Sequence, residues 1–94
     1  MTVKMPKTTF PADVQVKHFV LVAKHAVDFF CEEDLSAEDH LKWFHAQWWE
    51  NYTHLSYHKT LAKAERVADE LTRGPYPVCW IIYDHTGGMR DGNY

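Results

Sequence analysis

Helix signals at both ends of one long stretch, from Ser36 to Gly74, constrain the fold of this chain more than any other feature. Ser36 is followed three positions later by Asp39, an acidic variant of the capping box, so a helix is expected to begin at about Ala37. Gly74 suits the left-handed residue that follows a helix, and Pro75 cannot continue one. The stretch is therefore expected to begin and end as helix.

The apolar residues inside this stretch fall on two helical stripes, which are rotated from each other by roughly 145° at 100° per residue. The first stripe consists of Leu41, Phe44, Trp48, Tyr52 and Leu55, and the second of Leu61, Ala64, Val67, Ala68 and Leu71. One straight helix cannot bury both stripes against one flat partner. We favour a break between Thr53 and Thr60, where helix propensity is low and where Ser56 or Thr60 could cap a new helix. A single long rod with different partners along its length is the alternative.

Two periodicities compete between Phe10 and Glu33. The alternating valines favour a strand, whereas a second apolar set follows a 4-3-4-3 helical spacing. The alternating residues are Val14, Val16, Val20 and Val22, and the helically spaced ones are Val16, Val20, Ala23, Val27 and Phe30. Pro11 suits a first helical turn, so we predict a helix from about Pro11 to Cys31. The alternative is a strand to Val22 with a short helix after it.

The apolar run from Val78 to Tyr83 is predicted to be a strand covered on both faces. Its partner is expected to be Thr2 to Met5, the valine-rich stretch, or the same strand of a second copy, because Met89 to Asp91 is short and polar for a hairpin mate. Residues 1–9 are taken as an extended lead-in and 89–94 as a mobile tail. The predicted fold is one small α+β domain over residues 1–94, mostly helical, with two or three helices and a short C-terminal strand paired to the N-terminal segment or across a dimer.

Charge and composition limit the classes of function that this chain could have. The net charge is −3, with ten basic and thirteen acidic residues, which argues against a nucleic-acid binder with a broad basic face. The sequence has no run of 18 apolar residues and no signal-peptide core, so a cytoplasmic protein with no membrane partner is expected. Cys31 and Cys79 are expected to be reduced. No nucleophile with a base at a recognisable spacing is present, which favours a non-enzymatic role without a cofactor.

Glu50, His54 and His58 are the candidate metal ligands. They stand at i, i+4 and i+8, so an unbroken helix would place them on one face, and paired histidines at this spacing suit zinc. The activating glutamate of the HExxH motif is absent after His54. A histidine face hydrogen-bonded to its neighbours is the plainer interpretation, and a metal or hydrolytic site is the alternative function.

The surplus of aromatic residues in the same stretch is the strongest functional hint. Trp48 and Tyr52 are expected in the core, but further rings remain on other sides of the helix. We predict a partner-binding surface, and aromatic rings are enriched at such surfaces. Its residues are Trp43, Trp49, Glu50, His54 and Tyr57.

The predicted function is thus recognition or inhibition of another protein through an aromatic helical face, with a homodimer as one of the oligomeric states left open. Small chains without motifs are common among accessory and host-modulating proteins of mobile elements, which is an analogy and not a family resemblance. A further alternative is acidic mimicry of nucleic acid, for which the residues are Glu32, Glu33, Asp34, Glu38 and Asp39.

Overall fold

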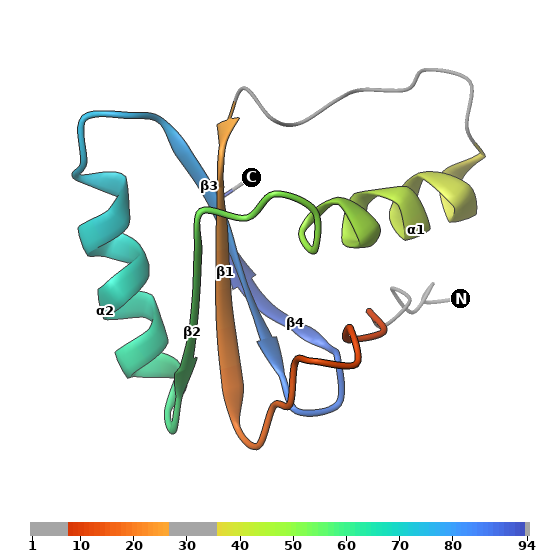
Figure 1. The fold of residues 1–94 in the computed structure, drawn as a ribbon, viewed down its shortest axis with the longest axis horizontal. Coiled ribbons are helices and arrows are strands. Elements are labelled where there is room, and N and C mark those ends of the chain that lie inside the picture. Colours follow the sequence, from red (N-terminus) through yellow and green to blue (C-terminus); the bar gives the residue numbers. More distant parts are fainter. Residues whose placement is uncertain (1–7, 27–35, 94) are drawn as a thin grey trace.

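The computed structural model describes residues 8–26 and 36–93, which form a four-stranded antiparallel sheet between two helices (Figure 1). The elements in chain order are β1 (Phe19–His25), α1 (Ala37–Gln47), β2 (His54–His58), α2 (Leu61–Thr72), β3 (Val78–Asp84) and β4 (Met89–Gly92). The strand order in the sheet is β2-β1-β3-β4. Helix α2 covers one face of the sheet, and α1 lies on the other face together with the N-terminal segment.

Strand β1 is the centre of the sheet and pairs antiparallel with both β2 and β3. The two flanking strands therefore run parallel to each other, and α2 connects them across β1 in a split β-α-β unit. A tight turn from β3 leads into the edge strand β4. In this turn Gly87 has a φ of 86°, a conformation that glycine adopts without a steric penalty.

The two faces of the sheet have separate cores. On the α1 face the buried residues are Val20, Val22, Trp48, Ile81 and Tyr83, with Phe10, Phe44, Trp49 and Leu55 packed around them. On the α2 face they are Leu21, Ala64, Ala68 and Ile82, with Phe19, Leu61 and Trp80 around them. Alternate residues of one strand enter opposite cores because successive side chains of a strand point to opposite faces.

The predicted mostly helical fold is wrong, because the described chain is built on a sheet and Phe19–His25 is its central strand. This strand falls inside the helix predicted from Pro11 to Cys31, of which residues 27–31 lie outside the described part. A central strand has two buried faces and two paired edges, which suits the β-branched valines of this segment. Pairing with distant strands thus outweighed the local helical spacing. The alternative prediction, a strand that ends at Val22, was closer to the structure, although the observed strand begins at Phe19 and continues past Val22 to His25.

The predicted break in the long stretch is confirmed. Helix α1 begins at Ala37 and ends at Gln47, and β2 occupies the interruption. Thr60 is the N-cap of α2, and its hydroxyl accepts a hydrogen bond of 3.2 Å from the backbone N–H of Lys63. Helix α2 ends at Thr72, close to the expected stop, but Gly74 does not have the positive φ expected of it.

The predicted strand at Val78 to Tyr83 is confirmed and is covered on both faces. Its partner is the valine-rich stretch, now β1, which was one of the three alternatives. Its other edge pairs with β4, so both edges are occupied within one chain and pairing of β3 across a dimer is excluded. Met89–Gly92 were rejected as a hairpin mate and assigned to a tail, and instead they form that edge strand.

Candidate functional site

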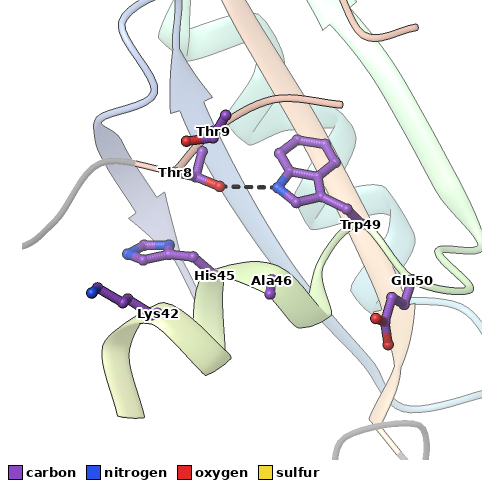
Figure 2. Close-up of a pocket in the computed structure, with 7 residues that line it drawn as sticks. All are labelled: Thr8, Thr9, Lys42, His45, Ala46, Trp49 and Glu50. Carbon is purple, nitrogen blue, oxygen red and sulfur yellow. Dashed lines mark hydrogen bonds between the residues drawn. The ribbon is translucent and has the colours of Figure 1, made fainter. Parts of the chain in front are cut away.

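A cavity of about 410 Å³ opens beside the C-terminal end of α1 (Figure 2). Its lining consists of Thr8, Thr9, Lys42, His45, Ala46, Trp49 and Glu50. We call it the α1 cavity. Four of the lining residues, at positions 42, 45, 46 and 49, recur at helical spacing, so one side of a single helix end forms most of the wall. The volume lies within the range of small-ligand and side-chain pockets.

The end of α1 is extended by two backbone hydrogen bonds that position the rest of the wall. The N–H of Trp49 donates to the carbonyl of Ala46, and the N–H of Glu50 donates to that of Gln47, each at 3.2 Å. Asn51 then adopts a φ of 54°, a left-handed conformation that asparagine tolerates better than most residues. This residue turns the chain away from the helix and into β2.

Thr8 forms the wall opposite the helix. Its backbone N–H donates to the carbonyl of Gly87 at 3.0 Å, which holds the N-terminal segment against the turn between β3 and β4. Its hydroxyl accepts a hydrogen bond of 2.9 Å from Nε1 of Trp49 (Figure 2). This bond joins two segments far apart in the sequence and orients the indole along the cavity.

Two lining residues, His45 and Trp49, belong to an aromatic and imidazole cluster centred on the buried Tyr83. The Trp49 indole stacks on the Tyr83 ring with centroids 5.7 Å apart and planes at 27°. Phe10 meets both rings edge-on. Nδ1 of His45 shares a hydrogen bond of 2.7 Å with the Tyr83 hydroxyl, and His45 is only 4% exposed. These contacts fix the rings, so the cavity is largely preformed.

A buried lysine of the sheet is hydrogen-bonded to the same end of the helix. Lys24 on β1 is 2% exposed, and its Nζ donates to the backbone carbonyl of Gln47 at 2.8 Å. The last carbonyls of a helix have no partner within the helix and carry partial negative charge, so a lysine there is favourable. Because Lys24 lies in the central strand, it fixes the helix end relative to the sheet.

The rim of the α1 cavity carries two exposed side chains of opposite charge, Lys42 and Glu50. Figure 2 shows them on opposite sides of the indole of Trp49. A cavity with an aromatic wall and both charge signs at its rim can orient a bound group through charge pairing.

The structure divides the predicted binding residues between two places. Trp49 and Glu50 line the α1 cavity together. Trp43 is half-buried in α1 and does not line it. His54 and Tyr57 belong to β2 instead of a helix, so one continuous aromatic helical face does not exist. Sequence reasoning missed the other cavity residues, although the helical spacing of Lys42, Ala46 and Trp49 was a signal for them.

The alignment of Glu50, His54 and His58 required an unbroken helix, which the structure does not contain, because Glu50 lies in the turn after α1 and both histidines are in β2. In the described ranges, 8–26 and 36–93, no group of three or more histidine, cysteine or acidic side chains is arranged to hold a metal ion. Tyr52, which was expected in the core, is 39% exposed.

The two histidines instead bracket a serine on the α2 face of β2. Oγ of Ser56 lies 2.8 Å from Nε2 of His54 and 2.7 Å from Nε2 of His58. A hydroxyl has one proton to donate, so one imidazole accepts it and the other must donate its own N–H. Burial lowers the pKa of His54, and burial, with smaller effects of His54 and Lys63, lowers the pKa of His58. Both shifts favour neutral rings.

The other residues named in the sequence analysis add little to the interpretation of the site. Glu32 to Asp34 and Cys31 lie outside the described residues, and Glu38 and Asp39 fall in the first turn of α1. Cys79 is a free thiol whose pKa is raised by burial. Among the helices of the described ranges, none combines the length and apolar character needed to span a bilayer.

The chain matches no protein-family model, no curated protein and no solved structure. The α1 cavity is therefore interpreted from its own geometry.

Proposed function

We propose that this protein is a non-enzymatic binding protein that recognises another protein by receiving one of its side chains in the α1 cavity. The observation that carries the proposal is the open cavity beside the half-buried Trp49, whose indole is fixed by Thr8 and Tyr83. Rigid aromatic side chains next to a pocket are the common form of a binding hot spot, because they add contact area with little loss of entropy.

The charges at the rim favour a polypeptide as the partner. Lys42 and Glu50 can pair with side chains of both signs, and the hydroxyls of Thr8 and Thr9 can bond to peptide groups. Nδ1 of the buried His45 is held by the Tyr83 hydroxyl, an arrangement that supports the wall and does not pair this nitrogen with a threonine hydroxyl of the lining. The cavity therefore suits recognition better than chemistry.

Filling the cavity tests this function. Ala46 is exposed and lies in the helical wall, so Ala46→Gln adds volume at the cavity with little cost to helix stability. Ala62→Gln is the matched control, since Ala62 is exposed on α2 away from the cavity. The immobilised wild-type protein and the Ala62→Gln control should retain the same partner protein from a native lysate, and Ala46→Gln should lose it. Equal retention by Ala46→Gln would contradict the proposal.

A charge reversal gives a second, independent test. Glu50→Lys should weaken retention of that partner and change its dependence on salt, because the rim would then carry one sign only. Glu70→Lys on the exposed side of α2 is the control with the same change in net charge. If both reversals weaken retention equally, long-range charge explains the binding and the α1 cavity does not.

A further inference from the structure

A second cavity, of about 370 Å³, lies where β1 begins and β2 ends, and it shares no lining residue with the α1 cavity. Its lining consists of Gln15, Lys17, His18, Phe19, Tyr57, His58 and Lys59. We call it the β1–β2 cavity. Phe19 at the start of β1 pairs with His58 at the end of β2, so the segments entering and leaving these two strands meet there (Figure 1).

The charge of this cavity is opposite to that of the whole chain. The chain carries −3, yet the lining holds two lysines, two histidines and no carboxylate. Within the described residues, neither Lys17 nor Lys59 forms an ion pair. The carboxylate of Asp84, across β1 from His58, accepts hydrogen bonds from Thr86 and Gly88 and is 3.7 Å from Arg90.

The start of a helix adds positive potential beside the cavity. Helix α2 starts at Leu61, directly after Lys59 and Thr60, and its first turn has no acidic residue to offset the positive end of the helix dipole. Burial lowers the pKa of His58, and the nearby His54 and Lys63 lower it further, so this imidazole is a neutral hydrogen-bonding group. An anion placed here would pair with the two lysines beside the helix N-terminus.

The cavity also offers an exposed ring. Tyr57 is 49% exposed, although it sits in a strand and its neighbour in register, Val20, is fully buried. An exposed tyrosine ring provides a surface on which a planar aromatic group can stack, and the amide of Gln15 can donate and accept hydrogen bonds at the edge of such a group.

We propose that the β1–β2 cavity binds a nucleotide, with the phosphate held by Lys17, Lys59 and His58 and the base stacked on Tyr57. A phosphate monoester carries nearly two negative charges and three acceptor oxygens, which matches a lining with two lysines and further hydrogen-bonding side chains. A simple carboxylate has one negative charge and no aromatic ring, so it would leave one lysine without a charge partner and the Tyr57 ring without a stacking partner. The ligand is either a free nucleotide or the phosphorylated end of a single strand, and both present the same chemistry.

Titrations of the full chain test the ligand class. The probes are the four ribonucleoside 5′-monophosphates, the matching nucleosides, inorganic phosphate, and a short oligothymidylate with and without a 5′-phosphate. We expect at least one monophosphate or the phosphorylated oligonucleotide to bind at least tenfold more tightly than its unphosphorylated form and than phosphate alone. The tighter of the two identifies the source. Equal affinity of a nucleotide and its nucleoside, or no binding at millimolar concentration, would overturn the proposal.

Substitutions test the location. Lys17→Gln combined with Lys59→Gln should weaken binding at least tenfold. Arg66→Gln combined with Arg73→Gln, which removes the same charge from exposed positions in α2 and directly after it, should leave binding unchanged. Tyr57→Ala should also weaken binding, and Tyr76→Ala, at another exposed tyrosine, should not. Unchanged binding in the lysine pair or in Tyr57→Ala would place the ligand elsewhere and overturn the proposal.

Discussion

The two faces of the sheet are covered in opposite ways. Helix α2 rests on its face through two small residues, Ala64 and Ala68, both fully buried, and its backbone comes close to three strands. In the described part of the chain, the backbone of α1 does not approach any strand as closely. Large rings such as Trp48 and Tyr83 fill the wider space between α1 and the sheet.

Polar groups follow the same division. The four buried polar or charged residues of the described chain all belong to the α1 side, namely Thr8, Lys24, His45 and Gln47. Buried polar groups must be hydrogen-bonded, and large rings leave irregular gaps. The α1 side therefore combines a cavity with buried, fixed polar atoms. The buried part of the α2 side is a small, close-packed apolar layer, and the polar residues on that face, His54, Ser56 and His58, are only half-buried on the edge strand β2. The comparison teaches that side-chain size decides which face of this sheet can hold a site.

The largest expected loss of stability comes from truncating a large ring in the core between α1 and the sheet. Trp48→Ala should lower the free energy of unfolding by about 3–5 kcal/mol, because it leaves a large void among rings that cannot collapse onto it. Tyr52→Ala should cost about 1 kcal/mol or less, since Tyr52 is largely exposed. Urea denaturation followed by circular dichroism measures both. Equal losses would show that the two rings are equally buried in solution and that the α1 core is wrongly placed.

Overfilling the α2 side comes next. Ala68→Leu should destabilise the protein by about 1–3 kcal/mol, because the added carbons have no space between α2 and the sheet. Ala62→Leu, on the exposed side of the same helix, should be near neutral. The midpoints of urea unfolding compare them. A stabilising Ala68→Leu would mean that α2 does not lie as close to the sheet as its alanines indicate.

Removing one hydrogen bond from the α1 side should have a smaller effect. Tyr83→Phe keeps the ring but removes the hydroxyl bonded to His45, and a buried imidazole nitrogen left without this partner costs about 1–2 kcal/mol. Tyr76→Phe, at a tyrosine 65% exposed, is the control and should change little. Thermal unfolding of both variants decides this. The prediction fails if the two variants have the same melting temperature.

The smallest effect concerns the histidines beside α2. The pKa values of His54 and His58 lie below the ordinary 6.5, so the unfolded chain binds more protons than the folded one at mildly acidic pH. Stability should therefore fall as the pH drops through 6.5 toward the lowered pKa values, and this contribution should be fully present above 6.5. Unfolding curves measured between neutral and mildly acidic pH test this.

The matched variant for that pH dependence is His54→Gln with His58→Gln. It should flatten the slope in this window, because glutamine has no proton to bind. His85→Gln, at an exposed histidine in the turn after β3, is the control variant. An unchanged slope in the double variant would assign the titration to other groups.

The sequence by itself determined the features that depend on neighbouring residues. The start of α1 at Ala37, the cap at Thr60, the end of α2 before Pro75 and the strand from Val78 could all be predicted, because caps, proline and runs of β-branched residues act locally. It also placed Trp48 in the core, and it identified Trp49 and Glu50, which line the α1 cavity.

Only the tertiary structure decided what depends on distant pairing. Phe19–His25 satisfied a helical pattern as well as a strand pattern, and its hydrogen bonds to β2 and β3 settled the choice. Met89–Gly92 became a strand because β3 offered a free edge. Both cavities likewise join residues far apart in the chain, such as Thr8 with Trp49 and Lys17 with Lys59. Local propensity cannot encode such neighbours, because strand pairing and cavity walls form only when the whole sheet closes its edges and covers its faces.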